Sequence, residues 1–554
     1  MKLKTVIFIL LFITYADAEE LLNNEVLYEQ IKDSEHIIDQ PRAQLFELGQ
    51  QNHSPIQLPY ESSCLTIHQI HFSGKKQFPL LTEKKLQQWS DILIGKCLGN
   101  EGIDIYLSYI EQQLSTIGYV TSQVLIPQQN LLFGILTIQL VPGIISKIIY
   151  YDTQQEHYSL DNAFVYDKKS PLNLRALEQG LDNLQNAPLT EPTIHVNQDP
   201  DEAQSSIIVI QRHKQRGLYG RITFDGRKLP GKADYLINNI LLLSNPLLLN
   251  DSLYLSLGRD ADNDHSKGLK NAYFSYSIPY KYGLFTAMGS YQDTYNDAGL
   301  TFSDGRSVRY AQRSKYISIE SSYLLHRDFN TKTSLVIGTQ LHTLNTFLAG
   351  IRLDNTEKRL ASYAVVGLNH QWFLPRGQAD FSVRYKQATD WFGAKLIHDL
   401  ELKKAQIYQF SADISQYFFL FSQPFLYHSA VEIQLAHSLL DGKLDKTSLA
   451  GRNGLKGFTY ATTRSGSQAL EIKQQLSWLA PFPKGQLYWG IDYGAISEDR
   501  GYFWRDNRLL GTEIGVKGQF KAINYQAFIG APLWKPAQTR ADPLITGFII
   551  GISY

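Results

Sequence analysis

Residues 487–493 read Leu-Tyr-Trp-Gly-Ile-Asp-Tyr, and in this stretch apolar side chains alternate with polar or small ones. Successive side chains of a β-strand point to opposite faces. Leu487 and Trp489 therefore share one face, and Gly490 and Asp492 share the other. The stretch predicts a strand with one apolar face and one polar face.

The same alternation continues from Gly217 to the last residue, Tyr554, and it is clear in residues 381–386 and 548–554. In a soluble sandwich the apolar face would pack in a core. In a membrane barrel the apolar face meets lipid and the polar face lines the lumen. The alternation alone fits both folds.

Three features favour an all-β membrane barrel over residues 215–554. The chain has 33 Tyr and 27 Phe, which suit the aromatic girdles of a barrel, and its final aromatic residue ends an apolar-face strand. It also begins with an export signal, described below. Roughly 340 residues, at about 20 per strand and connection, predict about 16 antiparallel strands. A single sandwich of this size would be unusually large.

The overall composition excludes other classes of protein. Mean hydropathy is -0.23, and no internal stretch supplies the ~18 apolar residues of a spanning helix. A hydrophobic fraction of 43% argues against disorder. The formal net charge of +0 gives no bulk attraction to nucleic acid, so we expect no nucleic-acid partner.

The first 18 residues have the features of a secretory signal peptide. Lys2 and Lys4 precede an apolar run over 6–15, and Ala16-Asp17-Ala18 follows as a small-x-small cleavage site. A short membrane anchor fits less well, because the apolar run has only about ten residues. We therefore expect export of the chain.

The two cysteines are Cys64 and Cys97. An even pair in an oxidising compartment usually bonds, so we expect one disulfide. Closing such a loop is worth about 3–4 kcal/mol in the chain-entropy model. No ligand cluster accompanies the pair, so a metal site is not expected.

Residues 19–40 carry Leu27, Ile31 and Ile38 at helical spacing among many polar residues. This pattern predicts a weakly amphipathic helix, either lying in a watery channel or forming a loose leader. Residues 41–62 contain several prolines and read as an extended linker.

Two small α+β modules are expected before the barrel, over 63–142 and 143–214. The first reads strand, helix, helix, strand, strand, and Gly118 follows its second helix where a C-cap glycine belongs. The second module reads strand, helix, strand, strand. Exposed edges of such sheets can capture an extended peptide, or the modules can act as rigid spacers. The sequence leaves both alternatives open.

Several short motifs occur together in a fixed order. In the first module they are Cys64, Gly95-Lys96-Cys97-Leu98, 118–122 (Gly-Tyr-Val-Thr-Ser) and 125–129 (Leu-Ile-Pro-Gln-Gln); in the second they are 172–175 (Leu-Asn-Leu-Arg) and 177–184. This set resembles the outer-membrane transporters of two-partner secretion, of the haemolysin-activator and filamentous-haemagglutinin-transporter type. The resemblance covers essentially the whole mature chain. It implies a lumen-plugging helix over 19–40, two polypeptide-transport-associated (POTRA) domains and a 16-stranded barrel.

The resemblance also implies specific site residues. Family members fold a loop with a Val-Arg-Gly-Tyr/Phe motif into the lumen, and here residues 455–458 (Leu455, Lys456, Gly457 and Phe458) look like this motif. Lys456 replaces the family arginine. Its implied partner on the barrel wall is Asp492, in a Gly-x-Asp pattern that begins at Gly490. A lysine lacks the two-pronged guanidinium, so we expect a weaker or differently placed contact.

Candidate partner-binding residues in the first module are Tyr119, Thr121, Ser122 and Gln123. Gln123 and Asn130 stand where the family commonly has Arg and Asp, which puts a charge contact of this module in doubt.

The implied function is export of one large secreted protein, a haemolysin, adhesin or contact-dependent growth inhibition toxin, from periplasm to cell surface. The partner would bind through its N-terminal secretion domain. Other expected contacts are outer-membrane lipid and the barrel-assembly machinery during biogenesis. We expect a monomer without a cofactor or metal.

Two other functions remain open from the sequence. One is a barrel-assembly or translocation-assembly factor of the same superfamily. The other is a passive porin or an outer-membrane enzyme, although the sequence has no HExxH, P-loop or GxSxG motif. We expect no enzymatic activity.

Overall fold

A computed structural model describes the chain over residues 56–152, 159–167, 170–213, 217–226, 235–261, 267–301, 305, 307–353, 359–394, 405–438, 440, 445–449, 454–459, 465–480, 485–498 and 507–554. The predicted signal peptide, the predicted plug helix and the first part of the predicted linker, 41–55, lie outside the described residues.

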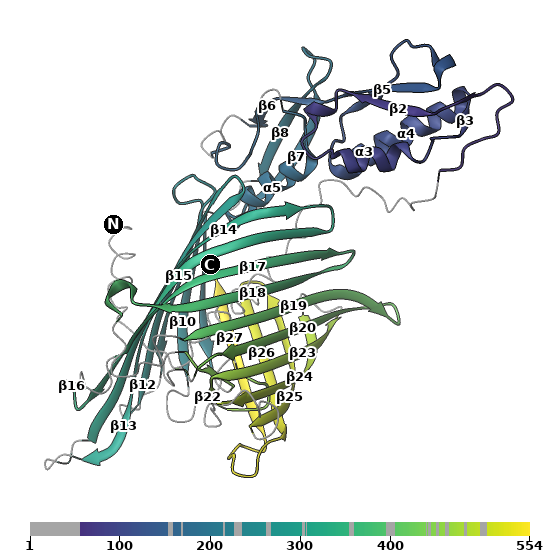
Figure 1. Ribbon diagram of the computed structural model, residues 1–554. Coiled ribbons are helices and arrows are strands. Elements are labelled where there is room, and N and C mark those ends of the chain that lie inside the picture. Colours follow the sequence, from purple (N-terminus) through teal and green to yellow (C-terminus); the bar gives the residue numbers. More distant parts are fainter. Residues whose placement is uncertain are drawn as a thin grey trace.

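The first module is a three-stranded sheet covered by two helices (Figure 1). Its sheet has the order β2-β5-β4, with β2 parallel to β5 and β4 antiparallel to it. A small separate ladder pairs β1 with β3. The elements are β1 (Leu65–Thr66), β2 (Gln69–Ser73), η1 (Lys75–Gln77), α3 (Glu83–Ser90), β3 (Cys97–Leu98), α4 (Asn100–Ile117), β4 (Gln123–Leu125), η2 (Leu131–Phe133) and β5 (Ile135–Val141).

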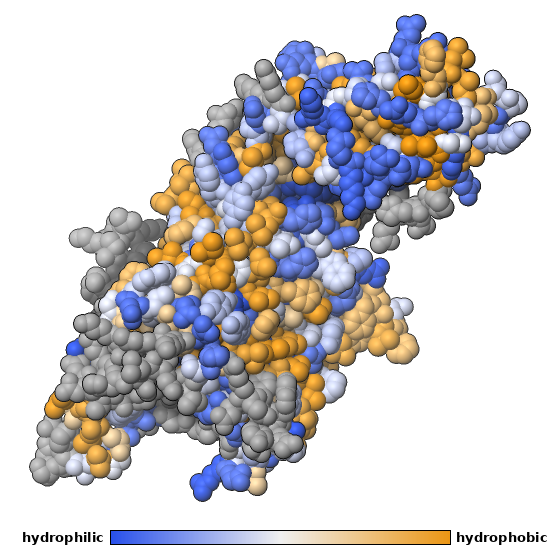
Figure 2. Space-filling view, viewed as in Figure 1, coloured by the Kyte–Doolittle hydropathy of each residue, from blue (hydrophilic) through white to orange (hydrophobic). Residues whose placement is uncertain are grey.

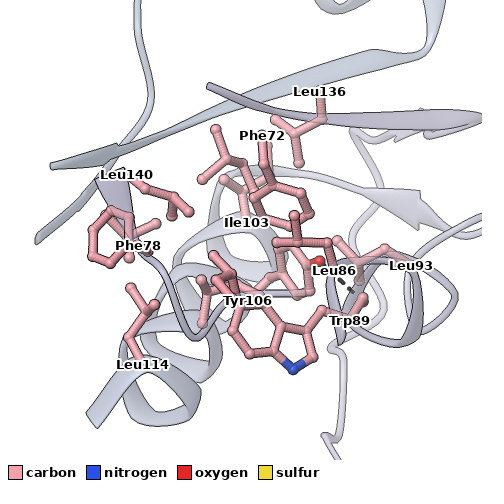
Figure 3. Close-up of a cluster of buried hydrophobic side chains, with 14 of the residues drawn as sticks. Phe72, Phe78, Leu86, Trp89, Leu93, Ile103, Tyr106, Leu114, Leu136 and Leu140 are labelled. Carbon is pink, nitrogen blue, oxygen red and sulfur yellow. Dashed lines mark hydrogen bonds between the residues drawn. The ribbon is translucent and has the colours of Figure 1, made fainter. Parts of the chain in front are cut away.

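The core of this module lies between the helices and one face of the sheet (Figure 3). Ile110 and Leu114 of α4 are fully buried, as the 3.6-residue period of the helix requires. Tyr106 is also fully buried, and its hydroxyl donates to the carbonyl oxygen of Trp89 at 3.0 Å. This hydrogen bond joins α4 to α3 inside the apolar core.

Both ends of α4 are closed by specific groups. Gly118 adopts a left-handed conformation with φ 110°, which confirms the predicted C-cap glycine. At the other end the Glu61 carboxylate accepts from the backbone N–H groups of Gly99, Glu101 and Gly102 at 2.7–3.1 Å. Because a disulfide joins Cys64 to Cys97, the segment before β1 is attached to the module at two points.

The second module repeats the sheet topology of the first. Its sheet has the order β6-β8-β7, with β6 parallel to β8 and β7 antiparallel to it. One helix covers the sheet, and the Asn173 side chain caps it by accepting from the N–H of Arg175 at 2.9 Å. The elements are β6 (Ile144–Tyr150), α5 (Leu174–Gln185), β7 (Glu191–Gln198) and β8 (Ser205–His213).

The rest of the described chain closes into an antiparallel barrel, in which the last strand, β27, pairs with the first, β9 (Figure 1). The predicted fold class, two modules followed by a 16-stranded barrel, is confirmed. The barrel strands are β9 (Leu218–Asp225), β10 (Leu236–Ser244), β11 (Ser252–Asp260), β12 (Gly268–Tyr280), β13 (Gly283–Thr301), β14 (Ser307–Arg327), β15 (Thr331–Leu348), β17 (Arg359–Leu374), β18 (Gly377–Thr389), β19 (Gln406–Leu420), β20 (Gln423–Ala436), β23 (Gln468–Ala480), β24 (Gly485–Ser497), β25 (Arg508–Phe520), β26 (Ile523–Trp534) and β27 (Ile545–Ser553).

Four short elements lie between the barrel strands. They are β16 (Ile351–Arg352), η4 (Trp391–Gly393), β21 (Thr447–Ser448) and β22 (Ser465–Gly466). The last two pair with each other inside the long connection from β20 to β23.

The two faces of the barrel wall have the predicted character. On β24, Trp489 is 53% exposed on the outer face, whereas Tyr488 and Asp492 on the inner face are 2% and 1% exposed. Hydrophobic residues cover a broad area of the wall in the view of Figure 2. Among the described residues, no helix is both long enough and apolar enough to cross a membrane.

Candidate functional site

The β20–β23 connection folds into the barrel, and its tip, residues 454–459, lies against the inner face of β24, β25 and β26. We call this segment the loop tip. The structure brings Lys456 to Asp492, as the family resemblance implies. The Lys456 backbone N–H donates to Oδ2 of Asp492 at 2.9 Å, and the Lys456 Nζ lies 3.4 Å from Oδ1. The shorter contact is thus made by the backbone and not by the lysine side chain.

Glycines on the inner wall let the loop tip approach the strands closely. A Cβ on Gly490 would lie 2.6 Å from Cδ and Cε of Lys456, and a Cβ on Gly511 would collide with the Lys456 carbonyl oxygen. Gly457 has φ +80°, and a side chain there would meet the Ala531 backbone. The tip therefore fits only against a wall that lacks side chains at these positions.

Apolar side chains complete the contact. Leu455 and Phe458 of the loop tip are 2% and 4% exposed, and they pack with wall residues of β23, β24 and β25. The wall residues and the further loop residue in this cluster are Ala469, Ile496, Leu509 and Leu449. Burial of these side chains adds hydrophobic stabilisation to the polar contact at Asp492.

The beginning of the same loop contacts β17 and the residue that follows β24. Tyr363 of β17 donates its hydroxyl to Asp445 at 2.7 Å, and Lys446 forms a 2.5 Å ion pair with Glu498. The loop is therefore attached at its base as well as at its tip.

The sequence pointed to Gly490 but not to every glycine of this site. Gly494 shares the inner face of β24 with Gly490, and continuing the alternation of 487–493 by one residue would have found it. Gly511 and Lys473 could not have been found in this way, because their places opposite Asp492 depend on the strand register.

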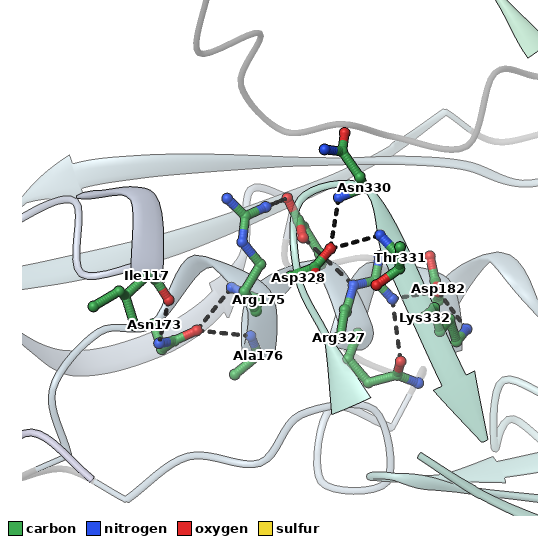
Figure 4. A network of polar contacts seen from close by, with 12 residues as sticks. Ile117, Asn173, Arg175, Ala176, Asp182, Arg327, Asp328, Asn330, Thr331 and Lys332 are labelled. Atoms are coloured by element: carbon green, nitrogen blue, oxygen red, sulfur yellow. Dashed lines mark hydrogen bonds and ion pairs between the residues drawn. The ribbon is translucent and has the colours of Figure 1, made fainter. Parts of the chain in front are cut away.

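The second module is fixed to the barrel by buried ionic contacts (Figure 4). Asp182 of α5 accepts from Arg327 at 2.6 Å and from Lys332 at 2.7 Å, at the turn between β14 and β15. Glu178 of α5 contacts Arg327 at 3.4 Å and Arg175 at 2.5 Å. These residues are the joint between the second module and the barrel.

The two cations beside Asp182 favour the ionised form of its carboxylate. Burial by itself would raise the pKa of Asp182, but the charges of Lys332 and Arg327 and their hydrogen bonds outweigh it. The pKa of Asp182 is therefore held well below its usual range.

An amide network extends the joint to neighbouring turns. Asn250, which is 0% exposed between β10 and β11, donates to the carbonyl oxygen of Ser159 at 2.7 Å and to the Asn162 side chain at 2.8 Å. It also accepts from Asn186 and Arg212 of the second module. Each of these groups would be costly to bury alone.

The predicted partner-binding residues lie where the two modules meet. Tyr119 is 3% exposed and its hydroxyl accepts from the Leu80 N–H at 3.3 Å. Ser122 accepts from the Gly143 N–H at 3.4 Å, and Thr121 is half-buried beside Gly143. Gln123 is exposed on β4. Of this set, only Gln123 is freely accessible in the structure.

Within the described residues, no group of three or more His, Cys, Asp or Glu side chains could hold a metal ion.

Comparison with known proteins identifies the parts of the chain. The family model for haemolysin secretion/activation proteins ShlB/FhaC/HecB matches residues 204–518, more than half of the chain. A ShlB-type POTRA model matches 65–143, and a second POTRA model matches 144–196.

Relatives match over nearly their full length. The outer membrane transporter CdiB-2 of Burkholderia pseudomallei is 24% identical, over 89% of this chain and 86% of that protein. The hemolysin transporter protein HpmB of Proteus mirabilis is also 24% identical, over 96% and 94%.

Among solved structures, CdiB from Escherichia coli has a TM-score of 0.83 at 20% identity and covers 98% of this chain and 100% of that chain. CdiB from Acinetobacter baumannii has a TM-score of 0.79 at 22% identity, with coverage of 98% and 100%. These likenesses show the same fold. Together with the family match, they show that the chain belongs to the ShlB/FhaC/HecB family, the outer-membrane transporters of two-partner secretion, with its POTRA domains in the periplasm.

Proposed function

We propose that this transporter exports one large partner protein, a haemolysin, adhesin or contact-dependent growth inhibition toxin, and that the loop tip controls its passage. The observation that carries this proposal is the docking of the loop tip on the inner wall through Asp492. A loop attached to the inner wall at both base and tip occupies part of the lumen. The partner would pass as an extended chain and gain its fold outside.

The POTRA domains would recruit the N-terminal secretion domain of the partner by edge pairing. Three of the four edge strands in the two sheets are poorly suited to pair with an added strand of the partner. β4 has only three residues, β6 has a register irregularity at Ile145/Lys147, and β7 contains Pro192. The remaining edge strand, β2, has five residues without Pro, Lys or a bulge. We therefore favour β2 as the pairing edge.

Cross-linking tests this assignment on the full-length transporter in lipid nanodiscs. A photo-reactive amino acid replaces His71, which is exposed on β2, or His195, which is exposed on β7. We expect the N-terminal segment of the partner to cross-link at position 71 and much less at position 195. Equal yields at both positions would show that β2 is not the preferred edge, and a higher yield at 195 would assign recruitment to β7.

Export itself is tested in cells with and without the gene, by mass spectrometry of culture medium and outer membranes. We expect one very large protein to disappear from the medium and cell surface while other barrels stay at normal levels. Depletion of many outer-membrane barrels would instead identify an assembly factor.

A further inference from the structure

The outer wall of the barrel carries a group of cations at the end farthest from the POTRA domains. We call Arg259 of β11, Lys270 of β12, and Arg309, Arg313 and Lys315 of β14 the basic collar. On β14, Ile317 and Ile319 are 47% and 42% exposed, whereas Ser318 and Glu320 are buried. Arg313 and Lys315 have the same parity as Ile317 and Ile319, so they lie on the lipid-facing side.

The collar begins where the apolar band of the wall ends. Tyr323, which is 54% exposed, lies near the periplasmic end of β14. Arg313 precedes it by ten residues and so lies toward the opposite end of the strand. At ~3.4 Å per residue and a tilt of ~40°, ten residues rise about 26 Å along the barrel axis. An outward apolar band is ~25 Å tall, which places Arg313 at the extracellular interface of the membrane.

The strand register connects the cations of neighbouring strands. Arg259 lies opposite Lys270, Lys270 opposite Asp293, and Asp293 opposite Arg313. The five cations outnumber Asp293 and Asp297, the acidic residues described on the same face of β13. The outer face of β11–β14 therefore has a net positive charge at this level. Figure 1 shows that β13 and β14 also reach farther from the POTRA domains than most of the barrel.

Aromatic rings hold three of these cations in place. The guanidinium carbon of Arg313 lies 4.5 Å from the centroid of the Phe347 ring, and that of Arg309 lies 4.6 Å from the Tyr295 ring. Lys315 Nζ lies 5.7 Å from the Tyr291 ring. Stacking orders a cation without using its N–H donors. Arg313 is 46% exposed, and its 3.4 Å contact from Nε to Asp293 leaves further donors available.

At the periplasmic turns, the cations are arranged differently from those of the basic collar. There Lys281 lies over Tyr280, Arg376 over Phe419 and Lys521 over Phe520. Each of these three cations lies singly over one ring, as expected of an interfacial girdle. The collar instead places three cations within seven residues of one strand. Such density at a membrane interface favours an anionic lipid headgroup beside it, because each cation near an anionic membrane surface contributes about 1 kcal/mol of attraction.

We propose that the basic collar binds the phosphate groups of a phosphorylated glycolipid in the outer leaflet. Neighbouring cations such as Arg313 and Lys315 can contact the phosphates of a lipid A headgroup, and arginine does so bidentately. The acyl chains of the lipid would lie on the apolar band below. The bound lipid would support the long β13–β14 strands where they leave the membrane.

The test uses the full mature transporter in nanodiscs of zwitterionic lipid, titrated with bisphosphorylated lipid A and with its enzymatically dephosphorylated form. Bound lipid is measured by native mass spectrometry. We expect tight binding of the bisphosphorylated lipid only. The double variant Arg313→Gln/Lys315→Gln should bind it roughly 25-fold more weakly, at about five-fold for each cation. The double variant Lys281→Gln/Lys521→Gln loses the same charge at the periplasmic turns and should bind it normally.

Three results would overturn the proposal. Equal binding of the dephosphorylated lipid would assign the surface to acyl chains alone. Equal weakening in both double variants would show a general charge effect. Displacement of the lipid by millimolar inorganic phosphate would show a free-phosphate site and not a lipid site. Because partner export by cells is measured separately, a negative lipid result leaves the proposed export function untouched.

Discussion

At the residue scale, Asp492 is the centre of the loop-tip contact. Its carboxylate accepts a 2.9 Å hydrogen bond from the Lys456 backbone and a longer one from the Lys456 side chain. Lys473 lies opposite Asp492 on β23, and its Nζ forms a 3.3 Å ion pair with Glu471. The shorter contact of Asp492 is made to a backbone N–H, which any residue except proline supplies at position 456. A lysine can therefore stand where the family has an arginine without loss of this contact.

Two substitutions separate these contributions. Asp492→Ala removes the acceptor of a buried N–H, so we expect loop docking to weaken by about 1–3 kcal/mol and partner export to fall strongly. Lys456→Ala keeps the backbone contact and should cost about 1 kcal/mol or less. The measurement is the amount of partner in the medium at equal transporter levels. Normal export by both variants would show that this contact is not needed.

The close approach at Gly511 gives a second prediction at this scale. Gly511→Ala places a Cβ against the Lys456 carbonyl oxygen, so the loop tip must leave the wall. We expect spin labels on the tip and on β25 to show a longer and broader distance distribution. Gly217→Ala is the matched control, because the nearest atom to its Cβ lies 3.9 Å away. An unchanged distance in Gly511→Ala would mean that the wall yields instead of the loop.

At the scale of elements, α5 is the helix through which the second POTRA domain contacts the barrel. Its acidic face contacts Arg327 and Lys332, which flank the turn between β14 and β15 (Figure 4). Arg175, at the start of α5, also lies over the ring of Phe329 at 5.5 Å. These contacts hold the helix against the barrel, so we expect the domain and the barrel to move together.

Neutralising Asp182 should loosen this joint. Asp182→Asn leaves Arg327 and Lys332 without their shared carboxylate, and breaking a buried pair typically costs ~3–5 kcal/mol. We expect hydrogen exchange in α5 to speed up markedly. Asp161→Asn, at an exposed position of the same module, is the control and should not change exchange. Identical exchange in both variants would contradict a stabilising joint.

The depressed pKa of Asp182 also sets the pH dependence of the joint. A lowered pKa stabilises the docked state above the unfolded value of ~3.9, and this stabilisation disappears as pH falls toward the docked value. We therefore expect α5 exchange to show the same protection at pH 7 and pH 5 and to lose it only below about pH 4. Loss of protection between pH 7 and pH 5 would show that another group controls the joint.

At the scale of the whole molecule, the loop tip occupies part of the lumen, and the family resemblance predicts that a plug helix of residues 19–40 shares it. These residues lie outside the described part of the chain, so the plug stays a prediction from the sequence. Removing them should raise single-channel conductance in planar bilayers, because the obstruction to ions would be smaller. An unchanged conductance would identify the segment as a loose leader. The control is a deletion of residues 43–54 of the predicted linker, which leaves both 19–40 and Glu61 intact.

The sequence predicted the strands and helices because the patterns that specify them involve residues close together in the chain. Alternation over 487–493 and similar stretches identified the strands, and the Gly118 cap identified the end of α4, since both depend on neighbours within one strand or one turn. The aromatic content, the final aromatic residue and the export signal then favoured a membrane barrel. The motif residues Lys456 and Asp492 were also found from the sequence, through the family resemblance. Their geometry was expected to be a side-chain ion pair, and the backbone N–H contact was not foreseen.

The tertiary structure decided which distant residues meet. Tyr119 was a candidate for partner binding, but it is buried in the core of the first module, where its ring packs edge-to-face on Phe78 and its hydroxyl accepts from the Leu80 N–H. No local pattern signals that burial. Likewise, the joint at Asp182 joins residues about 150 positions apart. The sequence by itself determined the barrel, the modules and the family, because periodicity and motifs are read along one segment. Only the register and closure of the barrel placed Gly511 under the loop tip and gathered the cations of β11, β12 and β14 on one surface.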